Sequence, residues 1–231
     1  NDDIIYGYDD LRLMPELLQA VLEQGYDIVM IDFYDGATWL QRNSALLQHV
    51  IRLCNEYKHG DESLVIAGAS MGGVLSRHAL RTMELNGEDH CARLWISMDA
   101  PHEGAHIPLS LQHAMRFSAD HGQEQAQLFR DRYLLRPAAR QMLDAQVFGD
   151  LNDFTDWYSQ LRELGYPEKC RSVALSNGLS SGEGLSYTDD ELMDWECDFS
   201  GVVHSKMLLL PESGDVYHEN STPGNPVMAH F

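Results

Sequence analysis

The sequence predicts an α/β fold in which a mostly parallel sheet is flanked by helices. Short apolar runs of strand length alternate with longer segments whose apolar residues recur at helical spacing. Turns rich in glycine separate most of these segments. An alternation of strands and helices folds into right-handed crossover units, whose strands lie parallel in one sheet.

The composition limits both the domain organisation and the partners. A chain of 231 residues can form one large domain with its own core, and no internal repeat is visible, so we expect a single domain over residues 1–231. The longest apolar runs are strand-sized, so we expect no stable membrane insertion. The formal net charge of −20 repels phosphates, so we expect no nucleic-acid partner.

The N-terminal quarter of the chain continues the predicted alternation. Residues 4–6 form a short predicted strand, and a helix with an apolar face follows and stops at Gly25. Residues 27–33 are a continuous apolar run, which is typical of a strand covered on both faces. Residues 38–57 have the apolar stripe of a long amphipathic helix.

The motif Gly68-Ala69-Ser70-Met71-Gly72 lies between a β-prone run at residues 63–67 and a helical pattern at residues 74–85. In this context, Gly-x-Ser-x-Gly predicts a nucleophile elbow with Ser70 as the nucleophile. The turn is tight, so we expect Gly68 and Gly72 to be the neighbours that must lack side chains. The turn also aims the N–H groups at the start of the helix toward the serine hydroxyl.

The next predicted strand spans residues 92–98 and ends at Asp99. Sites in parallel sheets lie beyond the carboxyl ends of the strands, so we expect Tyr8, Ser70 and Asp99 to converge on one edge. Residues 107–154 then have a helical pattern, and we predict a helical lid inserted at about residues 105–168. The alternative is a set of ordinary helices in the outer layer.

The C-terminal part of the chain resumes β character. We predict a helix at residues 157–164, a strand and turn at residues 171–178 and a long loop at residues 179–200. Residues 202–210 form the last predicted strand, and a loop then leads to His218.

A serine nucleophile needs a base to take its proton and return it to the leaving group. His218 follows the last predicted strand, which is the place that chain order gives to the histidine, and we favour it. His204 lies at or in a strand, and His78 lies too far along the elbow helix. His102 is better explained as a residue that braces the loop or lines the pocket. We expect the backbone N–H of Met71, with that of Tyr8 or Asp9, to bind the oxyanion.

The acid that orients the histidine is less clear from the sequence. Its usual position, after the strand that follows the lid, holds Asn177, which has no negative charge to stabilise an imidazolium. Asp99 ends the preceding strand and is the favoured acid. Asp215, three residues before His218, is the second candidate, and Asp32 is the third.

The four cysteines show no Cys-x-x-Cys spacing, so we expect no zinc site. Cys170 and Cys197 flank one loop-rich segment and could form a disulfide in an oxidising compartment.

Two stretches, Gly68-Ala69-Ser70-Met71-Gly72-Gly73 and Asp99-Ala100-Pro101-His102-Glu103-Gly104-Ala105-His106-Ile107-Pro108, carry a family resemblance. The chain resembles the lipase and esterase branch of the α/β-hydrolase superfamily, and is most similar to bacterial members, many of them secreted. The resemblance covers residues 4–112, and beyond them only residues 176–178 and His218.

This resemblance implies an α/β-hydrolase fold and hydrolysis of a small acyl ester or a lipid through an acyl-enzyme, without a metal or organic cofactor. It also implies a secreted or periplasmic bacterial protein. Asn177 departs from the usual pattern of the family. Acyl transfer, a non-catalytic binding scaffold and peptidase activity are the alternatives.

Overall fold

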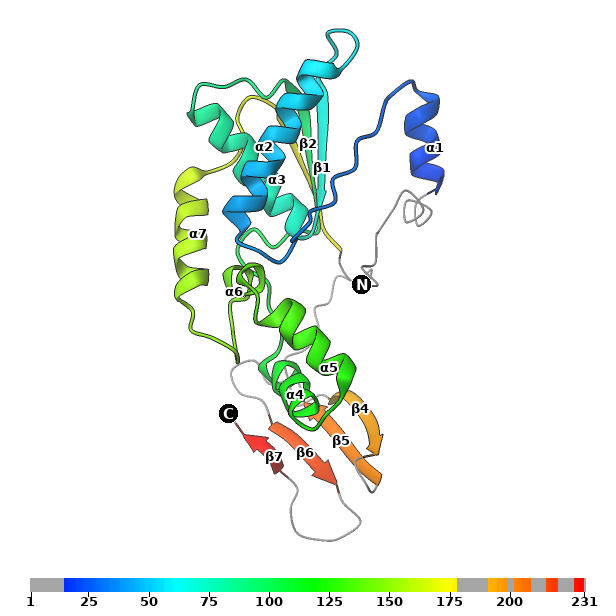
Figure 1. Cartoon of the computed structure of the whole chain (residues 1–231), viewed down its shortest axis with the longest axis vertical. Helices are drawn as coiled ribbons and strands as arrows, with labels where there is room; N and C mark the ends of the chain where they lie inside the picture. The colour runs from blue at the N-terminus through cyan, green and yellow to red at the C-terminus, as the bar shows by residue number, and fades with distance from the viewer. Residues whose placement is uncertain (1–14, 178–190, 199–201, 209–214, 220–226, 231) are drawn as a thin grey trace. The chain divides into compact units, whose positions relative to one another are not determined.

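The structure is a computed structural model that describes residues 15–177, 191–198, 202–208, 215–219 and 227–230. The chain divides into two compact units, residues 1–36 and residues 37–231. The second unit contains a three-stranded parallel sheet with helices packed on it and a four-stranded antiparallel sheet (Figure 1). The protein therefore has a mixed α/β architecture, as the sequence predicts.

The first unit contains helix α1 (Pro15–Glu23), and Gly25 follows its end with a positive φ of 82°. Both the helix and its glycine stop confirm the prediction. The strand predicted at residues 27–33 is wrong, because this segment pairs with no strand among the described residues and the side chains of Ile28, Val29 and Met30 are exposed. An apolar run reports hydrophobicity, but a strand also needs a neighbour for its hydrogen bonds. The strand predicted at residues 4–6 lies outside the described residues.

The parallel sheet has the strand order β1 (Leu64–Ala69), β2 (Ala92–Met98) and β3 (Arg171–Leu175). Both pairings are parallel, as the alternation of elements predicts. Opposite the end of β1 lies the end of β2, with Ala69 aligned to Met98. The carboxyl ends of all three strands therefore meet at one edge of the sheet.

Helix α3 (Met71–Leu85) follows β1 directly and packs against β1 and β2. Helices α2 (Leu40–Tyr57) and α7 (Asn152–Leu164) pack against α3 in turn. The predicted helices at residues 38–57 and 74–85 are thus confirmed within a few residues at their starts. The largest apolar side chains of the core come from these three helices and β2: Leu40, Ile51, Leu75, Leu80, Met83, Trp95, Trp157, Tyr158 and Leu161.

Between β2 and α7 the chain is helical, as the sequence predicts. It forms α4 (Leu109–Asp120), α5 (Glu124–Phe129), a π-helical turn (Arg130–Leu134) and α6 (Pro137–Met142). The buried Gln141 of α6 accepts a hydrogen bond from the Leu40 amide at 2.8 Å and donates one to the side chain of Gln41 at 3.0 Å. These bonds attach α6 to the first turn of α2, where the helical N–H groups have no partner within the helix.

The antiparallel sheet is ordered β4 (Glu191–Asp198), β5 (Val202–Leu208), β6 (Asp215–Glu219) and β7 (Val227–His230). It overturns three expectations. Residues 179–200 contain a strand, β5 belongs to an antiparallel rather than a parallel sheet, and two further strands follow it. Periodicity detects a strand but does not specify its partner, and strands linked by short connections pair antiparallel.

Candidate active site

Ser70 occupies the junction between β1 and α3 and has a φ of +49° and a ψ of −122°. This is a conformation that residues with a side chain rarely adopt, at a cost of roughly 1–3 kcal/mol. The Ser70 amide donates to the Met98 carbonyl at 2.8 Å, which fixes the turn to the end of β2. The serine is exposed, so a strained turn presents its side chain to solvent at the carboxyl edge of the sheet.

The turn requires a glycine at positions 68 and 73. The motif predicts Gly68 but gives Gly72, not Gly73, as the second glycine. A Cβ atom on Gly68 would lie 2.3 Å from the Gly72 carbonyl oxygen, and one on Gly73 would lie 2.5 Å from the Ala100 Cβ. A Cβ on Gly72 meets nothing within 4 Å, so the expected steric role of Gly72 is wrong. Gly72 takes part through its backbone, which the Gly68 Cα approaches closely. The doublet Gly72-Gly73 was the signal in the sequence that Gly73 could also be sterically required.

Asp99 lies one residue beyond the end of β2, on the strand next to Ser70. Its amide donates to the Leu175 carbonyl at 2.7 Å, which extends the ladder between β2 and β3 by one bond. Its φ is +46°, so the chain leaves the strand here in the left-handed conformation that aspartate tolerates better than most residues. Its side chain is exposed.

Asn177 binds Asp99, the residue that the sequence favours as the acid. The Asn177 side-chain amide donates to Asp99 Oδ2 at 2.9 Å, and its backbone N–H donates to Asp99 Oδ1 at 3.2 Å. Sequence reasoning identified both residues but missed this contact. The adjacency of their strands was the signal that could have revealed it.

His102 braces the loop after β2, which is one of the two roles that the sequence indicates. Its Nε2 lies 2.7 Å from the hydroxyl of the buried Ser97. The buried Arg77 guanidinium binds the carbonyls of Gly165 and Leu161, both at 2.8 Å. Burial and the nearby Arg77 charge, partly opposed by Glu103, lower the pKa of His102 to about 4, so it is a neutral ring at pH 7.

Besides the pair Ser97 and His102, a second serine and histidine lie in contact where α2 packs against α3. The Ser44 hydroxyl is 2.7 Å from His78 Nδ1, and the His78 ring stacks on Trp157 at a centroid distance of 5.1 Å. Burial lowers the pKa of His78. Both Ser44 and Ser97 are at most 2% exposed, so neither hydroxyl is available to a substrate.

The other predicted site residues are less fully described. His218 lies within β6, opposite Ser205 of β5, and not in the loop that the sequence predicts. Asp215 begins the same strand, and His204 lies in β5 opposite Glu219. The side chains of this sheet lie outside the described residues, as does all of Tyr8. Met71 begins α3, so its N–H belongs to the first turn of a helix, as an oxyanion donor requires.

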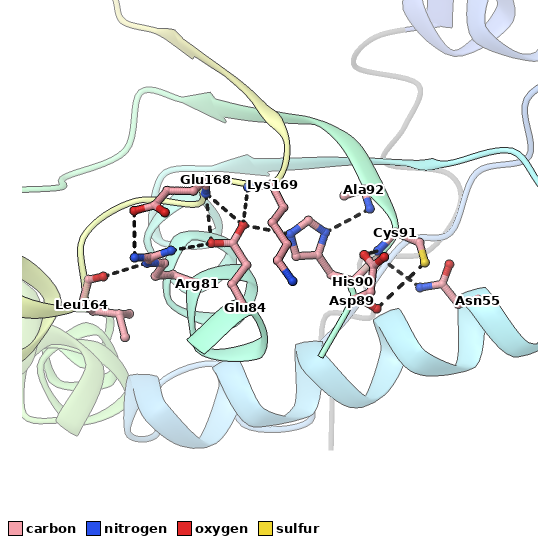
Figure 2. Close-up of polar contacts among 10 residues, drawn as sticks. All are labelled: Asn55, Arg81, Glu84, Asp89, His90, Cys91, Ala92, Leu164, Glu168 and Lys169. Carbon is pink, nitrogen blue, oxygen red and sulfur yellow. Dashed lines mark hydrogen bonds and ion pairs between the residues drawn. The ribbon is translucent and has the colours of Figure 1, made fainter. Parts of the chain in front are cut away.

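A larger polar cluster, the Glu84 cluster, lies at the opposite edge of the sheet, where β2 and β3 begin (Figure 2). The buried Glu84 carboxylate accepts hydrogen bonds from the Lys169 amide at 2.7 Å, from the Glu168 amide at 2.9 and 3.0 Å and from the Arg81 guanidinium at 2.8 Å. His90 accepts the Ala92 amide hydrogen at Nδ1 and so donates through Nε2 to Glu84 at 3.2 Å.

The Glu84 cluster joins the end of α3 to the loops that precede β2 and β3. Burial of the Glu84 carboxyl acts to raise its pKa, but the donors from Lys169, Arg81, Glu168 and His90 together lower that pKa to about 2. All of its donors are supplied by the fold, so the cluster stabilises the sheet and offers no group to a substrate. The sequence analysis did not anticipate it.

Cys170 is a free thiol in the structure, and the side chain of Cys197, its predicted partner, lies outside the described residues. Burial and the nearby Glu84 raise the pKa of the Cys170 thiol. Within the described ranges, no three acidic, histidine or cysteine side chains come together to hold a metal ion. None of the helices in those ranges has the length and apolar character needed to cross a membrane.

Comparison of the chain with models of protein families, with curated proteins and with solved structures finds no match.

Proposed function

We propose that this chain is a serine hydrolase that cleaves carboxylic esters through an acyl-enzyme, on an α/β-hydrolase fold. The observation that carries the proposal is Ser70, an exposed serine held at a φ of +49° between a parallel strand and the start of a helix. Residues in such strained backbone conformations cluster at functional sites, where the strain positions a reactive side chain.

In the proposed reaction, the Ser70 oxygen attacks the acyl carbonyl carbon while His218 takes the hydroxyl proton. The C–O bond to the alcohol breaks, and the imidazolium returns the proton to the leaving oxygen. Water then attacks the acyl-enzyme by the same route and releases the acid. Asp99 orients and stabilises the imidazolium, and the Met71 N–H binds the oxyanion, with Tyr8 as the second donor that the sequence predicts.

The position of α6 supports the predicted lid. Helix α2 ends six residues before β1 begins, so its first turn lies toward the carboxyl edge of the sheet. Gln141 and the Ala138 amide, which donates to the Ala37 carbonyl at 3.1 Å, attach α6 to that end of α2. Helix α6 is therefore attached at the same edge as Ser70, where a lid would exclude water from the acyl-enzyme.

Labelling with a fluorophosphonate tests the nucleophile. The wild-type protein is expected to form one adduct on Ser70, and Ser70→Ala is expected to lose it while remaining folded. Ser44→Ala and Ser97→Ala are the matched controls, because each removes a buried serine beside a histidine. Loss of labelling in either folded control but not in Ser70→Ala would contradict the assignment.

Turnover of p-nitrophenyl esters of increasing chain length tests the reaction and indicates the depth of the acyl pocket. Hydrolysis that depends on Ser70 supports the proposal. Predominant transfer to an added alcohol, with little free acid, would make the protein an acyltransferase instead.

A further inference from the structure

The Asp99 carboxylate receives a hydrogen bond at each oxygen, and both come from Asn177. The backbone N–H reaches Oδ1 at 3.2 Å and the side-chain amide reaches Oδ2 at 2.9 Å. A carboxylate has about four lone-pair sites, so two such bonds leave acceptor capacity on both oxygens. Asn177 thus fixes the rotation of the Asp99 carboxylate and leaves lone pairs on both oxygens free to accept further hydrogen bonds.

The sheet makes this arrangement rigid. Met98 is aligned with Leu175, and the Asp99 amide adds one more bond to the Leu175 carbonyl at 2.7 Å. Asp99 and Asn177 therefore leave adjacent parallel strands at nearly the same level. Both side chains are exposed, so the contact is not a requirement of core packing.

An amide suits this position because it donates hydrogen bonds without carrying a charge. A lysine or arginine would form an ion pair with Asp99 and offset the negative charge that an imidazolium needs. A second carboxylate would repel the first. Asparagine holds the acid and leaves its full charge for the histidine.

Building on the proposed function, we infer that Asn177 is a positioning residue for the catalytic acid, and that it acts on Asp99 rather than on the histidine. The inference explains why an amide stands where the resemblance leads one to expect a carboxylate. In this chain the acid comes from β2, and the next strand supplies the group that orients it.

The test compares three substitutions of Asn177 in the whole chain, with p-nitrophenyl butyrate as substrate. Asn177→Ala keeps the backbone donor and is expected to lower kcat roughly 10-fold, with KM changed by less than about twofold. Asn177→Asp keeps the shape but replaces a donor with an acceptor, and is expected to lower kcat roughly 100-fold. Asn177→Ser is expected to recover part of the loss, since its hydroxyl can donate.

Ser176→Ala is the matched control, because Ser176 is the exposed neighbour whose hydroxyl bonds only to the Asn177 carbonyl, at 3.2 Å, among the contacts found in the described residues. It is expected to retain wild-type kcat. Melting temperatures measured beside the kinetics verify that each variant is folded.

The outcomes separate the two proposals. If wild-type protein shows neither a Ser70 adduct nor ester turnover, both the function and the role of Asn177 are overturned. If the wild-type enzyme is active but Asn177→Ala matches it, only the positioning role is overturned. Should Asn177→Asp fail to fold, Asn177→Ser decides: activity above that of Asn177→Ala supports the role, and activity at or below it overturns the role.

Discussion

The two edges of the parallel sheet are built on opposite principles. At the carboxyl edge, Ser70 and Asp99 are exposed and both have positive φ values, of 49° and 46°. At the amino edge, Glu84 and His90 are buried and every oxygen of the Glu84 carboxylate is hydrogen-bonded (Figure 2). A positive φ alone does not separate the edges, because the exposed Cys91 just before β2 has a φ of 51°. What separates them is that exposed polar side chains stand at the edge where we propose that a substrate reacts, whereas buried and satisfied charge marks the edge that holds the strands together.

The comparison teaches that a network of titratable groups is not by itself a sign of catalysis. The Glu84 cluster has a glutamate, a histidine, an arginine and a large pKa shift, all of which are common at active sites. What it lacks is access, because its carboxylate is only 2% exposed and is bound by donors of the fold. Ser70 has access, and its exposure and backbone geometry are what make it the candidate.

The largest expected effect is the loss of Glu84. Glu84→Ala leaves the buried His90 ring and two backbone amides without their acceptor and removes one of the partners of the half-buried Arg81, and should lower the free energy of unfolding by about 3–5 kcal/mol. The half-exposed Glu88 is the matched control: it pairs with Arg52 at the surface, so Glu88→Ala should cost about 1 kcal/mol or less. Chemical denaturation measures both. Equal costs would show that the Glu84 cluster is not a structural centre.

The same carboxylate makes stability depend on pH in acid. Its folded pKa of about 2 lies below the ordinary glutamate pKa of 4.5, so the carboxylate stabilises the fold fully above pH 4.5. This contribution, on the order of 3 kcal/mol, is lost as the pH falls from 4.5 toward 2. Unfolding curves for wild type and Glu84→Gln should converge over that range. A constant difference from pH 6 to pH 2 would be inconsistent with this account.

At the other edge, the turn around Ser70 should distinguish between its glycines. Gly68→Ala places a Cβ against the Gly72 carbonyl, and should cost about 1–3 kcal/mol and abolish fluorophosphonate labelling. Gly72→Ala meets open space in the first turn of a helix, and should be neutral or stabilising by up to about 1 kcal/mol. If both variants lost the same stability and labelling, Gly72 would be as necessary as Gly68, as the Gly-x-Ser-x-Gly motif predicts and the packing does not.

The smallest expected effect is a gain. Ser70→Gly removes a side chain from a backbone conformation that only glycine adopts readily, and should raise the free energy of unfolding by about 1 kcal/mol while it abolishes activity. Ser63→Gly, at an exposed serine without a positive φ, should lower it slightly. Thermal unfolding monitors both variants. A loss of stability in Ser70→Gly would remove the argument that strain is stored at this residue.

The sequence alone determined the local elements of the parallel sheet. The helix at residues 38–57, the strand at residues 92–98 and the turn at Ser70 all follow from apolar spacing and glycine placement, which act over a few neighbouring residues. Identifying Asp99 as the acid candidate also needed only its place after a strand.

The tertiary structure decided what those elements pair with. The run at residues 27–33 forms no strand, and His218 lies in an antiparallel sheet, because hydrogen-bonding partners come from distant segments that no local pattern specifies. The same holds for the contact of Asn177 with Asp99, residues 78 positions apart, and for Gly73, whose neighbour Ala100 is on another strand's turn. Sequence locates chemical groups along the chain, and only folding determines which of them come together.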